Sequence, residues 1–243
     1  MQKIEFGNHW LVRLFGLEVH MDTMLTAWIA MIILIIFALT VTRNLNRIPG
    51  RLQVFSEMVM EFIEGISVGQ MGNEGYKHIM LIGSLFLFIL VSNLLGQVPL
   101  KLYHLHEGEF ASPTNDLNVT VALALIVSVY YLGSGILKSG IKYFKHYFQP
   151  FWFMAPLNFM EDLTRPLSLA IRLFGNILAG EVIILVILSI VPQFLFFAPI
   201  PFMLFELFVA FIQAFIFAVL AASYVAAATA GHDEHSHEST ISQ

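Results

Sequence analysis

The residue with the strongest claim to a chemical role is an arginine, Arg172, within the apolar C-terminal half of the chain. A guanidinium group keeps its positive charge at physiological pH. Burying that charge at the centre of a bilayer costs about 3 kcal/mol on insertion scales, so such a residue is a functional candidate by default. The structural alternative is an ion pair with Glu181 or Glu206 that only holds helices together.

Arg172 belongs to a thin polar stripe on a predicted helix. At about 100° per residue, five side chains fall within an arc of about 80°. A stripe of this kind allows another helix to approach closely. Near its start, Glu161 and Arg165 are spaced for an i,i+4 ion pair, whose simplest role is a salt bridge at a helix end. The stripe consists of Glu161, Arg165, Ser168, Arg172 and Asn176.

The last apolar segment adds two polar side chains, Glu206 and Gln213, seven residues apart and on one helical face. In an antiparallel hairpin, Gln213 would face Arg172, and Glu206 would face Glu181. Close carboxylates raise each other's affinity for protons, as desolvation does, which suits a proton relay. In an ideal helix, however, Glu181 lies opposite the stripe and therefore against another element. Asp116, at the start of an earlier apolar segment, is expected beside this carboxylate pair.

The composition indicates that a bilayer solvates this chain. Of its 243 residues, 58% are hydrophobic and 12% are charged, whereas about 25% of a soluble domain is charged. A net charge of −5 with few Lys and Arg argues against nucleic-acid binding. The absence of cysteine excludes disulfides, zinc thiolates and iron–sulfur clusters. No G-x-x-x-x-G-K-[ST] motif occurs, so nucleotide chemistry is expected on other chains.

The apolar runs predict an all-α polytopic protein forming one integral membrane domain over residues 1–243. About 20 helical residues cross a hydrocarbon core of ~30 Å. The segment 155–191 would reach about 55 Å, so it either breaks near Pro166 or lies strongly tilted, forming a long tilted hairpin with the last helix. The predicted membrane helices are 23–42, 79–100, 117–137, 155–191 and 202–230.

Two further segments are not expected to cross the membrane. Residues 51–69 carry apolar side chains at helical spacing, which predicts an amphipathic helix either on the membrane surface or packed on the other helices. The tail 231–243 is predicted to be disordered. Its His232, His235 and His237 raise a metal hypothesis, although a solvated polar tail is the default. No cofactor and no metal site are predicted.

Basic residues predict the orientation. They cluster after the first and third membrane helices, whereas the loop after the second carries only Lys101. By the positive-inside rule, the N-terminus is outside and the C-terminus is cytoplasmic. The first 22 residues lack the pattern of a secretory signal. The clustered residues are Arg43, Arg47, Arg51 and Lys77, then Lys138, Lys142 and Lys145.

Four sequence blocks resemble subunit a of the F-type ATP synthase membrane sector, and the resemblance extends from about residue 20 to 230. The most specific are PLSLAIRLFGNILAGE (166–181) and FIQAFIFAVLAASY (211–224). SPTNDLNVTVALAL (112–125) also resembles this family, and EFIEGIS (61–67) matches more loosely.

The resemblance implies a non-catalytic stator with two offset half-channels against a rotating ring of c subunits. The family's essential arginine matches Arg172. The implied partners are the c ring, the peripheral-stalk b subunits, the whole complex and the lipid bilayer, and the coupling ion is H⁺ or Na⁺. The membrane is a bacterial plasma membrane or a thylakoid. Outer-side positions match Asn176, Glu181, Glu206, Gln213 and Asp116, and cytoplasmic-side positions match Glu161, Asp162 and Ser168.

Two other classes of protein compete with this interpretation. A proton-coupled secondary transporter would also bury charges, but such proteins often show internal repeats with paired broken helices, and no repeat is evident in the sequence. A structural membrane scaffold would leave Arg172, Glu181 and Glu206 without a reason to be buried. Copurification separates the three classes, because a stator is expected with a c ring and a stalk, and a transporter alone or as a homo-oligomer.

Overall fold

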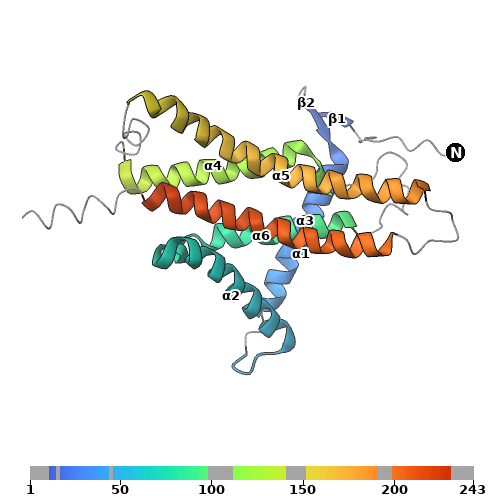
Figure 1. Cartoon of the computed structure of the whole chain (residues 1–243). Helices are drawn as coiled ribbons and strands as arrows, with labels where there is room; N and C mark the ends of the chain where they lie inside the picture. Colours follow the sequence, from blue (N-terminus) through green and yellow to red (C-terminus); the bar gives the residue numbers. More distant parts are fainter. Residues whose placement is uncertain are drawn as a thin grey trace, which may run out of the picture. The chain divides into compact units, whose positions relative to one another are not determined.

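The chain is built mainly of long helices (Figure 1). The structure, a computed structural model, describes residues 11–14, 17–43, 46–97, 112–140, 152–190 and 199–230. Within these ranges, five helices are long and apolar enough to cross a membrane, which confirms the predicted all-α polytopic class. The elements are β1 (Leu11–Leu14), β2 (Leu17–His20), α1 (Met21–Arg43), α2 (Arg51–Met71), η1 (Gly72–Lys77), α3 (Ile79–Gln97), η3 (Pro113–Asn115), α4 (Leu117–Ser139), η5 (Trp152–Met154), α5 (Ala155–Ile190) and α6 (Ile200–Ala230).

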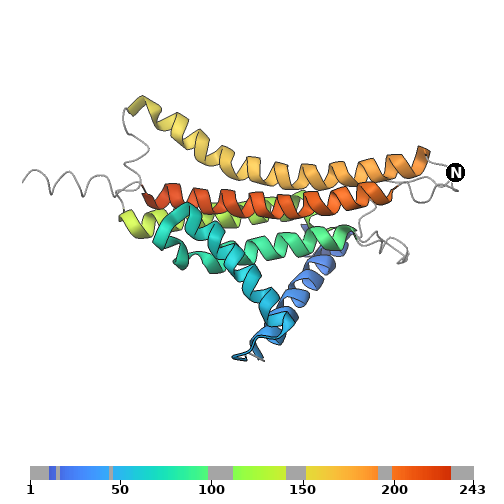
Figure 2. The ribbon, with the colours of Figure 1, turned by 60° about the horizontal axis from the view of Figure 1, so that its bottom comes forward.

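The helix bounds agree with the predicted ones to within three residues. Of the two alternatives for residues 155–191, the break near Pro166 is excluded, because α5 runs without interruption from Ala155 to Ile190 with this proline inside it (Figure 2). A proline removes one helical hydrogen bond and often kinks a helix without ending it. The tilt of the hairpin stays a prediction. The C-terminal tail and its three histidines lie outside the described residues.

A short β-hairpin precedes α1, and the sequence analysis did not predict it. Strands β1 and β2 are antiparallel, with Leu11 opposite His20 and Leu14 opposite Leu17. The second strand leads directly into α1, because His20 is followed by the first helical residue, Met21. The hairpin therefore sets where His20 stands at the start of the first membrane helix.

The chain forms two compact units, which are described separately. The first contains Met1–Ser56, Leu87–Val119 and Phe174–Ala214, and the second contains Glu57–Phe86, Thr120–Leu173 and Phe215–Gln243. Helices α2 to α6 each contribute residues to both units. The prediction of a single membrane domain over 1–243 stays a prediction.

In the first unit, small residues let helices approach one another. Ala210 and Ala214 of α6 are fully buried, and Asn93 of α3 donates a hydrogen bond from Nδ2 to the carbonyl oxygen of Ala210 at 3.4 Å. By contrast, α1 exposes most of its large apolar side chains, including Trp28 and Ile35. An apolar exposed surface of this kind suits lipid or another membrane helix.

In the second unit, α2 packs on the long helices. The ring of Phe62 lies 5.5 Å from that of Phe86 in α3 and 5.7 Å from that of Phe215 in α6, measured between centroids. The buried side chain of Ile63 lies against Gly83 of α3. For this part of the predicted amphipathic helix, packing on the other helices is confirmed. Its placement at a membrane surface stays a prediction.

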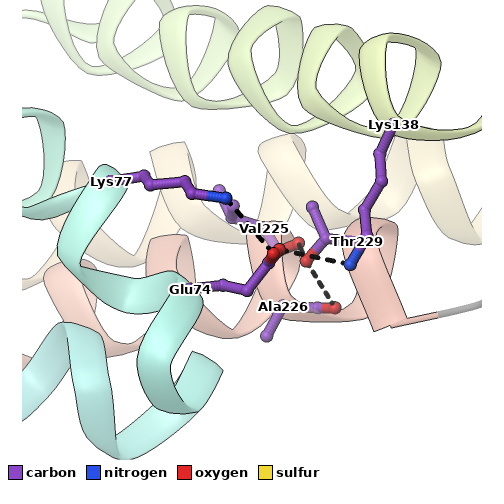
Figure 3. Close-up of polar contacts among 6 residues, drawn as sticks. All are labelled: Glu74, Lys77, Lys138, Val225, Ala226 and Thr229. Atoms are coloured by element: carbon purple, nitrogen blue, oxygen red, sulfur yellow. Dashed lines mark hydrogen bonds and ion pairs between the residues drawn. The ribbon is translucent and has the colours of Figure 1, made fainter. Parts of the chain in front are cut away.

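Polar contacts fasten the turn that follows α2 in the second unit (Figure 3). The carboxylate of Glu74 lies 3.3 Å from Nζ of Lys77 and 3.2 Å from Nζ of Lys138 in α4, and these ammonium groups lower the pKa of Glu74. Nδ1 of His78 lies 2.9 Å from the hydroxyl of Tyr130, also in α4, and burial lowers the pKa of His78. Exposed ion pairs contribute little stability each, so these contacts mainly fix where the turn lies against α4.

Candidate functional site

Arg172 lies midway along α5, and its side chain is exposed in the second unit. The two acidic residues about three turns earlier on the same helix, Glu161 and Asp162, both pair with Arg165. Among the described residues of this unit, no carboxylate lies within ion-pair distance of Arg172. A charge in the middle of an apolar helix, unpaired with any described carboxylate of its unit, is a candidate for pairing with a group from elsewhere.

Arg165 is the structural arginine of this helix. Its guanidinium lies 2.7 Å from Oε1 of Glu161 and 3.3 Å from Oδ1 of Asp162, and it also lies 5.5 Å from the ring centroid of Tyr224 in α6. The predicted i,i+4 pair is therefore confirmed, with Asp162 as a second partner. The hydroxyl of Tyr131 in α4 donates to the carbonyl oxygen of Asp162 at 3.3 Å. Both tyrosines escaped the sequence analysis, because nothing local places them beside α5.

The polar stripe continues from the paired residues to an exposed face of α5. Ser168 and Arg172 are exposed, as are the apolar neighbours Leu167 and Ile171. Between Leu167 and Arg172, the exposed side chains of α5 are therefore two apolar ones, one hydroxyl and one permanent positive charge. Such a face fits another membrane helix better than water.

In the first unit, α5 and α6 meet through an amide pair. Nδ2 of Asn176 donates to Oε1 of Gln213 at 2.6 Å, and Gln213 is only 2% exposed. The two orange ribbons run side by side here (Figures 1 and 2). The antiparallel register predicted from sequence placed Gln213 opposite Arg172, which precedes Asn176 by one helical turn. The observed amide partner of Gln213 is thus one turn from the predicted position.

Glu206 of α6 packs directly on the backbone of α5. A Cβ atom added to Gly180 would lie 2.5 Å from Oε1 of Glu206, closer than side-chain carbons approach such an atom. Only glycine at this position leaves room for the carboxylate. Glu181 is the next residue along α5, so Glu206 lies one residue from the position at which the sequence predicted its partner. A direct contact between the two carboxylates stays a prediction.

Glu181 is held by the turn that precedes α4. Oε2 of Glu181 accepts a hydrogen bond from Nδ2 of Asn115 in η3 at 2.6 Å, so this glutamate does lie against another element, as its helical angle predicted. Asp116 follows and caps α4, since Oδ1 accepts the backbone N–H of Asn118 at 2.8 Å. Oδ2 of the same carboxylate lies 2.7 Å from Nδ1 of His20.

A buried polar network fixes this turn in place. Oγ of Ser112 donates to the carbonyl oxygen of Ser92 at 2.9 Å and lies 2.6 Å from Oγ1 of Thr114. Thr114 in turn donates to Oδ1 of Asn93 at 2.7 Å. Because buried hydrogen bonds are costly to leave unmade, the network determines where the turn residues that follow Thr114 present their side chains.

Comparison with known protein families matches residues 24–226 to the family described as ATP synthase A chain. The chain belongs to this family. The "ATP synthase subunit a" of Gloeobacter violaceus is 46% identical to it over 233 residues, covering 96% of this chain and 93% of that protein. The range matched to the ATP synthase A chain family contains every candidate site residue predicted from the sequence, whereas His20 lies just before it.

The first unit contains the candidate residues matched to the family's outer side. It also contains buried polar side-chain atoms that lack a protein partner among the described residues. Those in the described ranges include one atom each from five residues of the first unit. Buried polar groups that lack a protein partner normally bind water. No group of three or more His, Asp or Glu residues that could hold a metal ion occurs in the described ranges. The five atoms are Oγ1 of Thr23, Oγ of Ser92, Nε2 of Gln97, Oδ1 of Asn115 and Nε2 of Gln213.

Proposed function

We propose that this chain is the ion-conducting stator subunit of an F-type ATP synthase, forming two offset half-channels against a rotating c ring. The observation that carries the proposal is Arg172, a permanent charge midway along α5 on an exposed face, with no carboxylate partner among the described residues of its own unit. A carboxylate on a passing c subunit supplies the missing partner. Family membership supports the same assignment.

Rotation follows from the cost of exposing a charge to lipid. A ring carboxylate can face lipid while it is neutral but not while it is ionised. When it reaches Arg172, the guanidinium favours its ionised form, and it releases its proton to the cytoplasmic half-channel. Beyond the arginine it takes up a proton from the outer half-channel and re-enters lipid. Arg172 also repels protons that would leak directly between the half-channels.

The outer half-channel is assigned to polar residues of the first unit. Asp116, Glu181 and Glu206 supply groups that exchange protons, and the amides of Asn176 and Gln213 lie further along α5 and α6. The unpartnered buried atoms of the same unit support a hydrated path. The cytoplasmic half-channel is assigned to Glu161, Asp162 and Ser168.

The subunit is proposed to take no part in ATP chemistry, which belongs to other subunits of the complex. Each charge that falls through ~100 mV releases about 2.3 kcal/mol. One ATP therefore requires several ring steps, and the leak past Arg172 must be small. The proposed partners are the c ring and the peripheral stalk, with the N-terminus outside and the C-terminus in the cytoplasm of a bacterial plasma membrane, or on the equivalent sides of a thylakoid.

Copurification tests this proposal against the competing transporter. An affinity-tagged chain, extracted in a mild detergent from its own membranes, is expected to bring with it the c ring and the peripheral-stalk subunits in fixed proportion. A proton-coupled transporter would instead emerge alone or as a homo-oligomer. Mass spectrometry of the intact assembly gives the composition. Recovery of this chain without ring subunits would contradict the stator assignment.

Replacing Gly180 with alanine is expected to slow ATP-driven proton pumping about tenfold. The added Cβ would meet Oε1 of Glu206 at 2.5 Å, so the carboxylate must leave its position in the proposed outer path. Loss of a proton-transfer group typically lowers a rate by about 10² to 10⁴. We expect a smaller reduction when the group is only displaced. Acidification of inverted vesicles, followed with a pH-sensitive dye, measures the effect.

The matched control for this variant is Gly133→Ala. Gly133 also lies within a membrane helix, but among the described residues no side chain and no other segment lies within 4 Å of a Cβ added there. This variant should pump at the wild-type rate, because the same chemical change meets no side chain. Equal pumping by both variants would show that the position of Glu206 does not matter for proton transfer.

A further inference from the structure

A histidine that lies just before the residues matched to the family contacts an acid of the proposed outer path. Nδ1 of His20 lies 2.7 Å from Oδ2 of Asp116, although 96 residues separate them in the sequence. The side chain of His20 is 28% exposed, and that of Asp116 is 6% exposed. The imidazole therefore stands between a buried carboxylate and the surroundings of the chain.

The elements around this contact hold both partners in place. His20 ends β2, whose pairing with β1 fixes its backbone, and α1 begins at the next residue. Asp116 is fixed by its cap to Asn118 and by the network that anchors η3. The contact is thus made between two constrained backbones.

Other charged groups near this end of the first unit are mostly acidic. Asp22 follows His20 on α1, and Glu181 is bonded to Asn115, the residue before Asp116. In β1, Arg13 stands opposite Glu18 of β2 in the strand register.

We propose that His20 is the proton-collecting residue of the outer half-channel and passes protons to Asp116. A proton from water binds Nε2 of the imidazole, and the proton on Nδ1 moves to Oδ2 of Asp116. The ring is left neutral with its proton on Nε2, and exchange with water restores the starting tautomer. The charge balances, because one proton enters the ring and one leaves it. This inference rests on the function proposed above.

The turn that contains Asp116 also contacts Glu181, the next acid of the proposed proton path. Asn115 and Asp116 are consecutive, and Asn115 is bonded to Glu181 through Nδ2, whereas its Oδ1 is buried without a partner among the described residues. Such an atom is a natural site for a water molecule. A proton that reaches Asp116 therefore arrives one residue from the amide that holds Glu181, the next acid of the proposed path.

The alternative role for His20 is structural, as an ion pair that only ties β2 to the start of α4. The two roles differ in their dependence on pH. An imidazole exchanges protons near neutral pH, whereas a lone carboxyl does so about 2–3 units lower. If His20 collects protons, replacing it should change how the rate of ATP synthesis depends on pH. If it is only a structural ion-pair partner, replacing it should lower that rate equally at every pH.

The test uses the complete ATP synthase complex in liposomes, with a fixed potassium diffusion potential and a variable pH on the side of the proposed outer half-channel. His20→Gln, which keeps a hydrogen-bonding side chain without a titratable group, is expected to synthesise ATP about tenfold more slowly at neutral pH. Its half-maximal rate should shift to more acidic pH by at least about one unit. In His20→Gly, added imidazole should restore ATP synthesis. The reference is the rate of the wild type at the same imidazole concentration.

Two further variants make each outcome decisive. His78→Gln removes a histidine that also contacts a side chain, Tyr130, but lies outside the proposed path, and it should keep the wild-type profile. A uniform loss in His20→Gln with no shift, and no rescue of His20→Gly by imidazole, would overturn the role of His20. Arg172→Ala is run in parallel. If Arg172→Ala retains full synthesis, the proposed function itself fails, whatever His20 does.

Discussion

In vesicles that carry the whole complex, Arg172→Ala is expected to reduce ATP-driven acidification by at least about a hundredfold. Arg172 has no carboxylate partner among the described residues of its own unit, so its charge is available to the ring carboxylate of the proposed mechanism. Breaking a buried ion pair by removing one partner costs about 3–5 kcal/mol, which corresponds to at least a hundredfold change in an equilibrium. Without the guanidinium, the ring carboxylate has nothing that favours its ionised form at the interface.

The passive permeability of the membrane sector distinguishes loss of coupling from loss of assembly. After the catalytic head is stripped, Arg172→Ala vesicles should still conduct protons, because the proposed half-channel residues remain. Lys138→Gln is the matched control, since it removes a positive charge from the same unit at a position paired with Glu74. This control should pump normally. Pumping near the wild-type rate by Arg172→Ala would reduce Arg172 to a structural residue and remove the basis of the mechanism.

The main helices were predictable because a helix that crosses a bilayer needs about 20 consecutive apolar residues. A run of this kind can be recognised within one segment of the sequence. Helix α1 was expected over 23–42 and occupies Met21–Arg43. The choice between a break at Pro166 and an uninterrupted α5 was not predictable from the sequence. Whether a proline ends a helix depends on the packing around it as well as on the chain. The β-hairpin before α1 escaped because two four-residue strands give only a weak periodic signal.

The candidate site shows the same division between local and distant contacts. The pair of Glu161 and Arg165 followed from i,i+4 spacing on one helix, and the structure confirms it. The partner of Gln213 was predicted to within one turn, because an antiparallel hairpin fixes the register of its two helices. The contact of Asn115 with Glu181 spans 66 residues, and no pattern within either segment encodes it.

A second large effect is expected at Glu181, the acid that Asn115 holds. Glu181→Gln keeps the size of the side chain but removes the group that can carry a proton, so ATP-driven pumping should fall by about 10² or more. The loss should extend to passive proton conduction after the head is stripped, unlike the loss expected for Arg172→Ala. Both rates are measured in the same vesicle preparation with a pH-sensitive dye.

Asn115→Ala is the companion variant that separates the titratable group from its position. It removes the 2.6 Å hydrogen bond to Oε2 and leaves the carboxyl of Glu181 in place. A hydrogen bond to a charged group contributes about 1.5–3 kcal/mol, so Asn115→Ala should slow pumping less than Glu181→Gln and should retain passive conduction. If Glu181→Gln conducts protons as well as the wild type does, the outer path must run through other groups. Glu181 would then be only a structural partner of the turn before α4.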